Sequence, residues 1–297
     1  MRRRLAALAG LALVLAPGLA GAAALDLFYE RSVMVAANAR CGLFTPAIAT
    51  ALEAAKAQAR GASLRSGVEE DRLAQVEQQA ASRAGGADCA SRDVTLAAAR
   101  VRQAFEGYAR LNSIDYPGEI AAWRAEHVVP AAGTAGWGLA QSTRFGFDRM
   151  TFGLAVRGAG RPLMAVAVFS DGRQPFAARL VLRDRSRAPR PYLDRRMADA
   201  SGHLPLPARA PPRFATQVFN AEARSIAGRD LRPRDTAGGW AFRFPAAATD
   251  ALTRLDPRES VAVEFVFAGE TGDIVRTAYI EVGDFAAGRA FLAMPRG

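Results

Sequence analysis

Two stretches, NARCGLFTP at residues 38–46 and GGADCASRD at residues 85–93, mark the turns of the segment that decides the fold. Each contains one of the two cysteines of the chain, Cys41 and Cys89. Glycines and N-cap residues in these stretches end one helix and begin the next. The surrounding segment, residues 26–116, therefore reads as a set of short helices joined by turns, with the cysteines at two of the joints.

Apolar residues recur at helical spacing in four places along this segment. Asp26 is expected to cap the first helix, Thr45 followed by Pro46 the second, and Ser91 the fourth. The predicted helices cover residues 26–42, 46–61, 68–84 and 91–111. Because alanine supplies much of the apolar face, the pattern predicts a small antiparallel bundle with a thin core.

The first 24 residues are typical of a secretory signal peptide. Arg2 to Arg4 precede an apolar run from Leu5 to Leu15, and small residues follow. This order of basic, apolar and small regions directs export, and the apolar run is short for a bilayer span. We therefore expect a periplasmic or secreted protein after loss of residues 1–24, with an uncleaved membrane anchor as the alternative.

Export favours a disulfide between Cys41 and Cys89, because exported proteins fold in an oxidising compartment. Such a bond would close a loop over most of the predicted bundle, and chain entropy assigns it roughly 4 kcal/mol. Two free, buried cysteines are the alternative. A zinc site is disfavoured, since two thiols without nearby histidines cannot complete a tetrahedral shell. We expect neither a metal nor a cofactor.

Beyond a predicted linker at residues 129–133, the hydrophobic period shortens and strands are expected. Strand-like runs cover residues 137–143, 149–157, 163–170, 175–183, 214–226, 240–244, 261–268 and 274–282, and helical runs cover residues 246–255 and 284–294. Two helical turns are expected at Glu119–His127, and a tight turn at Asp171–Gly172. The predicted domains are a helical one at residues 25–130 and a β-rich one at residues 135–297. The fold class is α+β: a disulfide-tied helical bundle followed by a mainly antiparallel β-sandwich-like domain.

Residues 183–212 break the strand pattern with prolines and arginines, so we expect a long exposed loop. Its arginines form a candidate site for an anionic envelope surface: Arg183, Arg185, Arg187, Arg190, Arg195 and Arg196. Guanidinium groups bind phosphate and carboxylate through paired N–H donors. The alternative is that these arginines only keep a surface loop solvated.

The net charge of +10 lies mainly in the second half of the chain, because residues 25–130 hold 12 basic and 13 acidic side chains. Nucleic-acid binding is disfavoured by export and by the lack of aromatic residues interleaved with the basic ones. Catalytic patterns are equally sparse: His127 and His203 are the two histidines, and no nucleophile elbow accompanies them. We therefore predict no catalytic residues.

The last third of the chain carries a family resemblance. Phe244-Pro245 leads a helix, the Val261–Phe267 strand follows, and the sequence GDFAAGRA at residues 283–290 comes after the final strand. This order resembles the C-terminal half of exported bacterial proteins of the invasion-associated locus B type, over residues 135–294 at most. The cysteine pair that such proteins often carry here is missing, and Asp284 interrupts the Gly-Phe motif. The resemblance implies an envelope or secreted protein and brings no catalytic residues.

These features together predict an exported, non-enzymatic envelope protein that works as an interaction or binding module. Its expected partner is another envelope protein or an anionic envelope surface, and its oligomeric state is left open. The alternative is a periplasmic hydrolase with its site in a cleft between the two domains.

Overall fold

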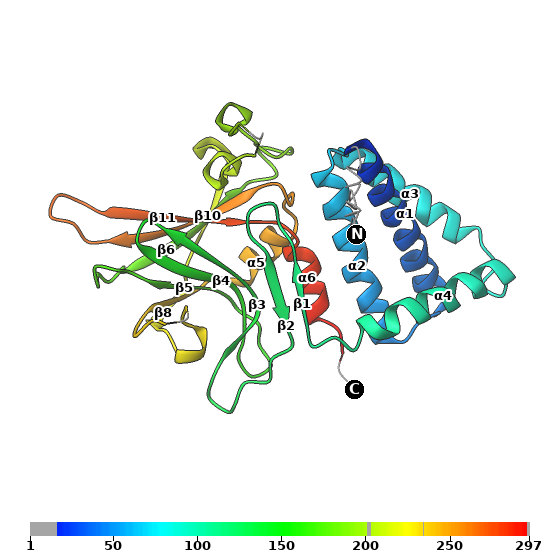
Figure 1. Cartoon of the computed structure of the whole chain (residues 1–297), viewed down its shortest axis with the longest axis horizontal. Coiled ribbons are helices and arrows are strands. Elements are labelled where there is room, and N and C mark those ends of the chain that lie inside the picture. Colours follow the sequence, from blue (N-terminus) through cyan, green and yellow to red (C-terminus); the bar gives the residue numbers. More distant parts are fainter. Residues whose placement is uncertain (1–16, 201–202, 234, 296–297) are drawn as a thin grey trace, which may run out of the picture.

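The computed structural model describes residues 17–200, 203–233 and 235–295, and Figure 1 shows a group of helices beside two β-sheets. The N-terminal helices are α1 (Pro17–Cys41), α2 (Pro46–Arg65), α3 (Glu70–Gly85) and α4 (Arg92–Tyr108). Residues 1–16 of the predicted signal peptide lie outside the described residues. Within the described residues, no helix is long and apolar enough to cross a membrane.

Local capping signals start two of these helices as expected. The Thr45 hydroxyl accepts a hydrogen bond from the Ile48 N–H, and the Ser91 hydroxyl accepts one from the Val94 N–H, each at 3.4 Å. The first helix differs from the prediction, because α1 begins upstream of Asp26 and that residue is not its N-cap. The alanines just before Asp26 are strong helix formers, which allows the helix to continue through it.

The helical part has a small core. Phe28, Leu64, Leu73 and Val76 are buried together among α1, α2 and α3. The fourth helix, α4, runs obliquely to these three (Figure 1), and Ala98 is its only buried residue among those described. The prediction of a thin, alanine-rich core is therefore confirmed.

The predicted disulfide is present. Cys41 is the last residue of α1 and Cys89 lies in the turn before α4, with 5.7 Å between the two Cα atoms. The bond ties the start of α4 to the end of α1. It thus holds a helix that has a single buried residue, Ala98, among those described.

Two antiparallel sheets form the rest of the chain, with strand orders β1-β2-β3-β4-β5-β9-β8 and β11-β10-β6-β7. The strands are β1 (Ser113–Tyr116), β2 (Trp123–Glu126), β3 (Gly136–Phe145), β4 (Asp148–Val156), β5 (Leu163–Val168), β6 (Ala177–Arg183), β7 (Thr216–Asn220), β8 (Ala223–Ile226), β9 (Trp240–Arg243), β10 (Ser260–Phe267) and β11 (Ile274–Glu281). The predicted α+β class is confirmed. The hairpin of β10 and β11 has the expected position.

The two sheets pack against each other through aromatic side chains. Phe242 of the larger sheet and Phe265 of the smaller one have ring centroids 5.6 Å apart. Phe169, just after β5, packs on the same ring at 5.2 Å, and Phe152 and Leu180 belong to the same buried cluster. Aromatic residues bury large areas, so this cluster is the main core of the molecule.

Two further helices, α5 (Ala246–Thr253) and α6 (Phe285–Leu292), cover the end of the sandwich that faces the helical part. In Figure 1, α6 lies between α2 and the strands β2 and β3. Ala51 and Ala54 of α2 belong to the same buried cluster as the sandwich core. The helical and β-rich parts therefore meet in a packed joint.

One expectation about this region was wrong. Residues Glu119–His127 do not form helical turns, because β2 pairs with β1 and β3 and buries Trp123 and Ala125 on one face. The sheet therefore begins at Ser113, inside the segment that we had assigned to the helical domain. The predicted tight turn at Asp171–Gly172 is present, with the Gly172 N–H bonded to the Phe169 carbonyl at 3.0 Å, and it joins strands of different sheets.

Candidate functional site

Arg183, the first of the six candidate arginines, is buried, contrary to the prediction that it is exposed. At the end of β6, its Nε and Nη2 groups donate hydrogen bonds to the two carboxylate oxygens of Glu259, each at 2.7 Å. Its Nη1 group donates to the carbonyls of Ala188 and Pro189. A buried guanidinium needs this full set of acceptors. Arg183 therefore anchors the loop that follows it and is not available to a ligand.

The next turn of the loop is fixed by Asp184. One carboxylate oxygen accepts hydrogen bonds from the Ser186 N–H at 2.9 Å and the Ser186 hydroxyl at 2.6 Å. These bonds hold the pKa of Asp184 below its ordinary value. Arg187 contacts the other oxygen at 3.3 Å. The turn has a defined shape as a result, and it directs the intervening residue, Arg185, towards α2 and α3.

Arg185 meets a second arginine at the first residue of α3. The Glu70 Oε1 atom lies 3.1 Å from Nη2 of Arg185 and 2.7 Å from Nη2 of Arg60, which belongs to α2. All three side chains are about one-third exposed. One carboxylate thus holds two guanidinium groups from segments far apart in the sequence.

These two arginines line a cleft of about 240 Å³ between α2 and the segments around α5 and α6, together with Arg254, the exposed residue that follows α5. We call this site the arginine cleft and define it by Arg60, Arg185 and Arg254. It lies where the helical and β-rich parts meet. No local sequence pattern points to Arg60 or Arg254, because only the fold brings them to the loop.

Asp284, at the N-cap of α6, contributes to the floor of the arginine cleft. Its two oxygens accept hydrogen bonds from Arg65 at 2.8 and 3.1 Å. Burial raises the pKa of Asp284, and Arg65 opposes that rise. A side-chain carbon at Gly61 would lie 2.5 Å from the Asp284 carboxylate, so glycine is needed for this close approach of α2 and α6.

The charges of the cleft do not balance. Arg65 and Asp284 neutralise each other in the floor, and Glu70 is the acidic partner of the rim. Three guanidinium groups line the cleft, and Glu70 is bonded to two of them, Arg60 and Arg185. Each arginine has five N–H donors, so Arg60 and Arg185 keep donors in excess of the bond to Glu70. The arrangement favours an anion with two or more acceptor oxygens.

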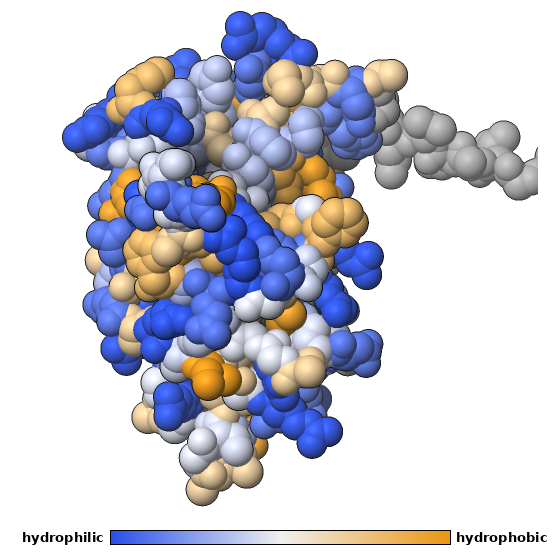
Figure 2. Space-filling model, turned by 90° about the vertical axis from the view of Figure 1, so that its left-hand side faces the viewer, coloured by the Kyte–Doolittle hydropathy of each residue, from blue (hydrophilic) through white to orange (hydrophobic). Residues whose placement is uncertain are grey.

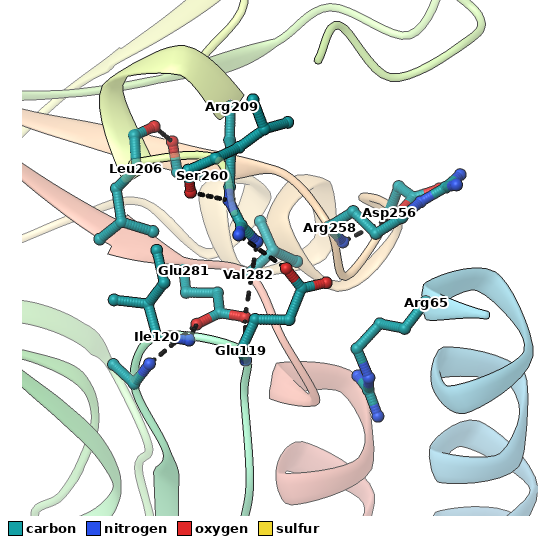
Figure 3. Close-up of polar contacts among 12 residues, drawn as sticks. Arg65, Glu119, Ile120, Leu206, Arg209, Asp256, Arg258, Ser260, Glu281 and Val282 are labelled. Atoms are coloured by element: carbon teal, nitrogen blue, oxygen red, sulfur yellow. Dashed lines mark hydrogen bonds and ion pairs between the residues drawn. The ribbon is translucent and has the colours of Figure 1, made fainter. Parts of the chain in front are cut away.

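A second polar network holds the far end of the loop (Figure 3). The buried Glu281 carboxylate accepts hydrogen bonds from the backbone N–H groups of residues 119–121, at 2.8 to 2.9 Å. Arg209, also buried, donates to the Glu119 carboxylate at 2.6 Å. A side-chain carbon at Gly118 would lie 2.7 Å from a Glu281 oxygen, so glycine allows the chain to wrap around this acid. The network fixes the loop to the sandwich.

The remaining candidate arginines do not converge on the cleft. The side chains of Arg187, Arg190, Arg195 and Arg196 are exposed along the loop. Arg190 lies 3.7 Å from Asp71 of α3, while Arg196 pairs with Asp194 at 2.8 Å. Of the six arginines predicted from the sequence, the structure brings Arg185 into the cleft.

The two histidines lie elsewhere. The His127 ring packs on Phe291 of α6, with 4.6 Å between centroids. The backbone N–H of His203 donates to Asp199 in the loop. Neither is among the residues that line the arginine cleft. Over the described residues, no group of three or more histidine, cysteine or acidic side chains is placed to hold a metal ion.

The opposite end of the sandwich carries a cavity of about 460 Å³ lined by Asp148, Asp171 and Arg276, and this arginine is already bonded to both carboxylates. Figure 2 views that end and shows its apolar residues as separate spots among hydrophilic ones. Phe147, at the tip between β3 and β4, is almost fully exposed. Scattered apolar residues of this kind are ordinary features of protein surfaces.

No protein-family model matches the chain, and no curated protein or solved structure is significantly similar to it. The resemblance of residues 135–294 to the invasion-associated locus B type therefore stays a prediction.

Proposed function

We propose that this protein is an exported, non-enzymatic binding protein of the cell envelope, and that its arginine cleft takes an anionic group of an envelope partner. The signal-peptide pattern of residues 1–24 supports export, and the Cys41–Cys89 disulfide fits an oxidising compartment. The binding assignment is supported by the chemistry of the cleft.

The observation that carries the proposal is the convergence of Arg60, Arg185 and Arg254 on one cleft. They come from α2, from the loop after β6 and from the end of α5, so the fold assembles them. Guanidinium groups offer paired donors that match the oxygens of phosphate and carboxylate. A lipid phosphate or an acidic side chain has this chemistry, and both occur in the envelope.

Glu70 does not prevent such binding. It is partly exposed, and exposed ion pairs contribute only about 0 to 1 kcal/mol to stability. An incoming phosphate can therefore take over donors of Arg60 and Arg185 at small cost. The exposed Arg187, Arg190, Arg195 and Arg196 extend the basic surface along the loop.

The arrangement supports binding better than hydrolysis. A cleft between the two parts was the place expected for a hydrolase site, and the arginine cleft occupies that place. Its lining supplies guanidinium groups, the Thr253 hydroxyl, which donates to the Thr249 carbonyl, and one acid, Asp284, whose oxygens are already held by Arg65. A hydrolytic site needs a nucleophile or an activated water with a base beside it.

Vesicle sedimentation tests the proposal. Wild-type protein should bind vesicles that contain phosphatidylglycerol, and this binding should fade towards 1 M salt, where the Debye length is about 3 Å. The variant R60Q/R185Q/R254Q should bind roughly 100-fold more weakly at low salt, because each arginine near an anionic surface contributes about 1 kcal/mol.

A matched control separates the cleft from overall charge. The variant R144Q/R157Q/R229Q removes the same number of exposed arginines at other sites. It should keep most of the vesicle affinity. Equal losses in the two triple variants would mean that net charge, and not the cleft, attracts the anionic surface. If wild-type protein bound neither phosphatidylglycerol vesicles nor purified lipopolysaccharide, an anionic surface would be rejected as the partner.

A further inference from the structure

An apolar groove between α1 and α4 lies apart from the arginine cleft. Two cavities, of about 660 and 520 Å³, lie along these helices and share Val33, Met34, Arg83 and Ala97 in their walls. The two cavities adjoin along α1 and α4, and we refer to them together as the groove. Each volume falls in the range of about 300 to 1,000 Å³ that is common for small-molecule sites.

The groove exists because α4 is tied at both ends and packs loosely between them. Cys89, just before α4, is bonded to Cys41 at the end of α1. At the other end, the hydroxyl of Tyr108 lies 2.7 Å from that of Tyr116 in β1. The apolar face of α4 was expected to be buried, yet residues such as Val101 are only half-buried.

The walls of the larger cavity are mostly apolar, with charged groups at a few points. Its apolar side chains include Leu27, Val33, Met34, Leu52, Val101 and Phe105. Its charged side chains are those of Arg31, Arg83, Arg100 and Glu30. An apolar channel with a small excess of positive charge complements a molecule that has an apolar chain and an anionic end.

Arg31 places a positive charge at a fixed position in the groove. It is half-buried, and its Nη1 group donates to the Ala55 carbonyl at 2.6 Å. Among the described side chains, no carboxylate forms an ion pair with it. Burial lowers the pKa of Arg31, and the nearby Tyr108 and Glu30 oppose that shift. An anionic group beside Arg31 would also stabilise its charged form.

We propose that the groove binds a long-chain fatty carboxylate, with its chain along Val33, Met34 and Val101 and its carboxylate beside Arg31 and Arg100. The chain is held by burial of apolar surface. The carboxylate is held by charge-assisted hydrogen bonds from the guanidinium groups. This inference does not depend on the arginine cleft, because the two sites share no residue.

Calorimetric titration of the purified protein with dodecanoate, below its micellar concentration, tests the groove. Saturable binding of about one dodecanoate per chain is expected, and dodecanol, which has the same chain without the charge, should bind at least tenfold more weakly. Arg31→Gln should reduce dodecanoate affinity about tenfold and leave dodecanol nearly unchanged, because the substitution removes the positive charge and keeps the apolar walls. Arg100→Gln, at an exposed position, should act in the same direction without affecting folding.

Two variants of α4 locate the chain. Ala97→Phe should weaken both ligands, because Ala97 lies in the wall shared by the two cavities. Leu96→Ala, at an exposed neighbouring position that lines neither cavity, should bind like wild type. Equal affinity for dodecanoate and dodecanol would contradict the assignment of the carboxylate to Arg31. Unchanged binding in Ala97→Phe would overturn the proposal. It would also be overturned if dodecanoate did not bind and the wild-type protein formed a dimer that Ala97→Phe dissociates, since the groove would then be a dimer interface.

Discussion

The helical part and the sandwich are held together by different means. The sandwich buries a cluster of large rings, including Phe152, Phe242 and Phe265, between two sheets. The helical part buries mostly alanine, and α4 contributes one buried residue among those described. Stabilisation grows with buried apolar area, so packing stabilises the sandwich. The helical part buries less apolar area and depends more on its disulfide for stability. The looser part contains the open groove, and the arginine cleft lies at the joint.

The largest expected effect is in the sandwich core. Phe265 is buried against Phe145, Phe169 and Phe242, so Phe265→Ala should lower the free energy of unfolding by about 3 to 5 kcal/mol. Phe105→Ala, at a half-buried position of α4, should cost less than about 2 kcal/mol. Urea unfolding of both variants measures the difference. If Phe105→Ala lowered the free energy of unfolding more than Phe265→Ala, the helical part would be the better packed of the two.

The next effect should appear in the helical part. The bond between Cys41 and Cys89 closes a loop of 48 positions, and its removal in Cys41→Ser should cost about 2 to 4 kcal/mol. Hydrogen exchange followed by mass spectrometry should show faster exchange in α1 and α4 and unchanged protection in β10. Cys89→Ser should give the same pattern. Uniform loss of protection across both parts would show that the sandwich also depends on the disulfide.

The joint between the two parts should respond to a smaller change. Gly61→Ala places a side-chain carbon against the Asp284 carboxylate that Arg65 holds, so a loss of about 1 to 3 kcal/mol is expected despite the better helix propensity of alanine. Gly107→Ala in α4 is the control, because its new side chain meets open space and should stabilise the helix by up to about 1 kcal/mol. Thermal unfolding compares the two. Stabilisation by both substitutions would mean that α2 and α6 can separate without cost.

The smallest effect concerns the two tyrosines between α4 and β1. Tyr116→Phe removes the hydrogen bond to Tyr108 and should cost about 1 kcal/mol near pH 8. Burial raises the pKa of Tyr116, so its contribution is present below the unfolded value of about 10 and is lost as pH rises above it. The difference between wild type and variant should therefore shrink in urea titrations above pH 10. A difference that grows with alkaline pH would contradict burial of the phenol.

Local sequence signals predicted the parts of the fold that depend on local physics. Thr45 and Ser91 are N-caps because their hydroxyls bond to N–H groups three residues away, which a sequence pattern can register. The β10–β11 hairpin was equally visible, since its strands are neighbours in the chain. Trp123 was missed, although its alternation with Ala125 is a two-residue period, because only four residues form the strand.

The site depended on contacts that no local pattern contains. Arg183 looked like its exposed neighbours, and its burial follows from Glu259, which lies 76 residues further along the chain. Arg60 and Arg185 are brought together by Glu70, a residue that from sequence alone belonged to a solvated helix face. Charge composition could indicate a basic surface, but only the fold selects which arginines share a cleft.

Nuclear magnetic resonance of arginine side chains tests the central claim, that an anion binds in the arginine cleft, most directly. Titration with glycerol 1-phosphate, a soluble lipid headgroup, should shift the Nε–H resonances of Arg60, Arg185 and Arg254 along one binding curve. The resonances of the exposed Arg144 and Arg229 should barely move over the same range. A binding site in the cleft would be contradicted if all five arginines shifted equally without reaching saturation. It would also be contradicted if the resonances of the three cleft arginines did not shift.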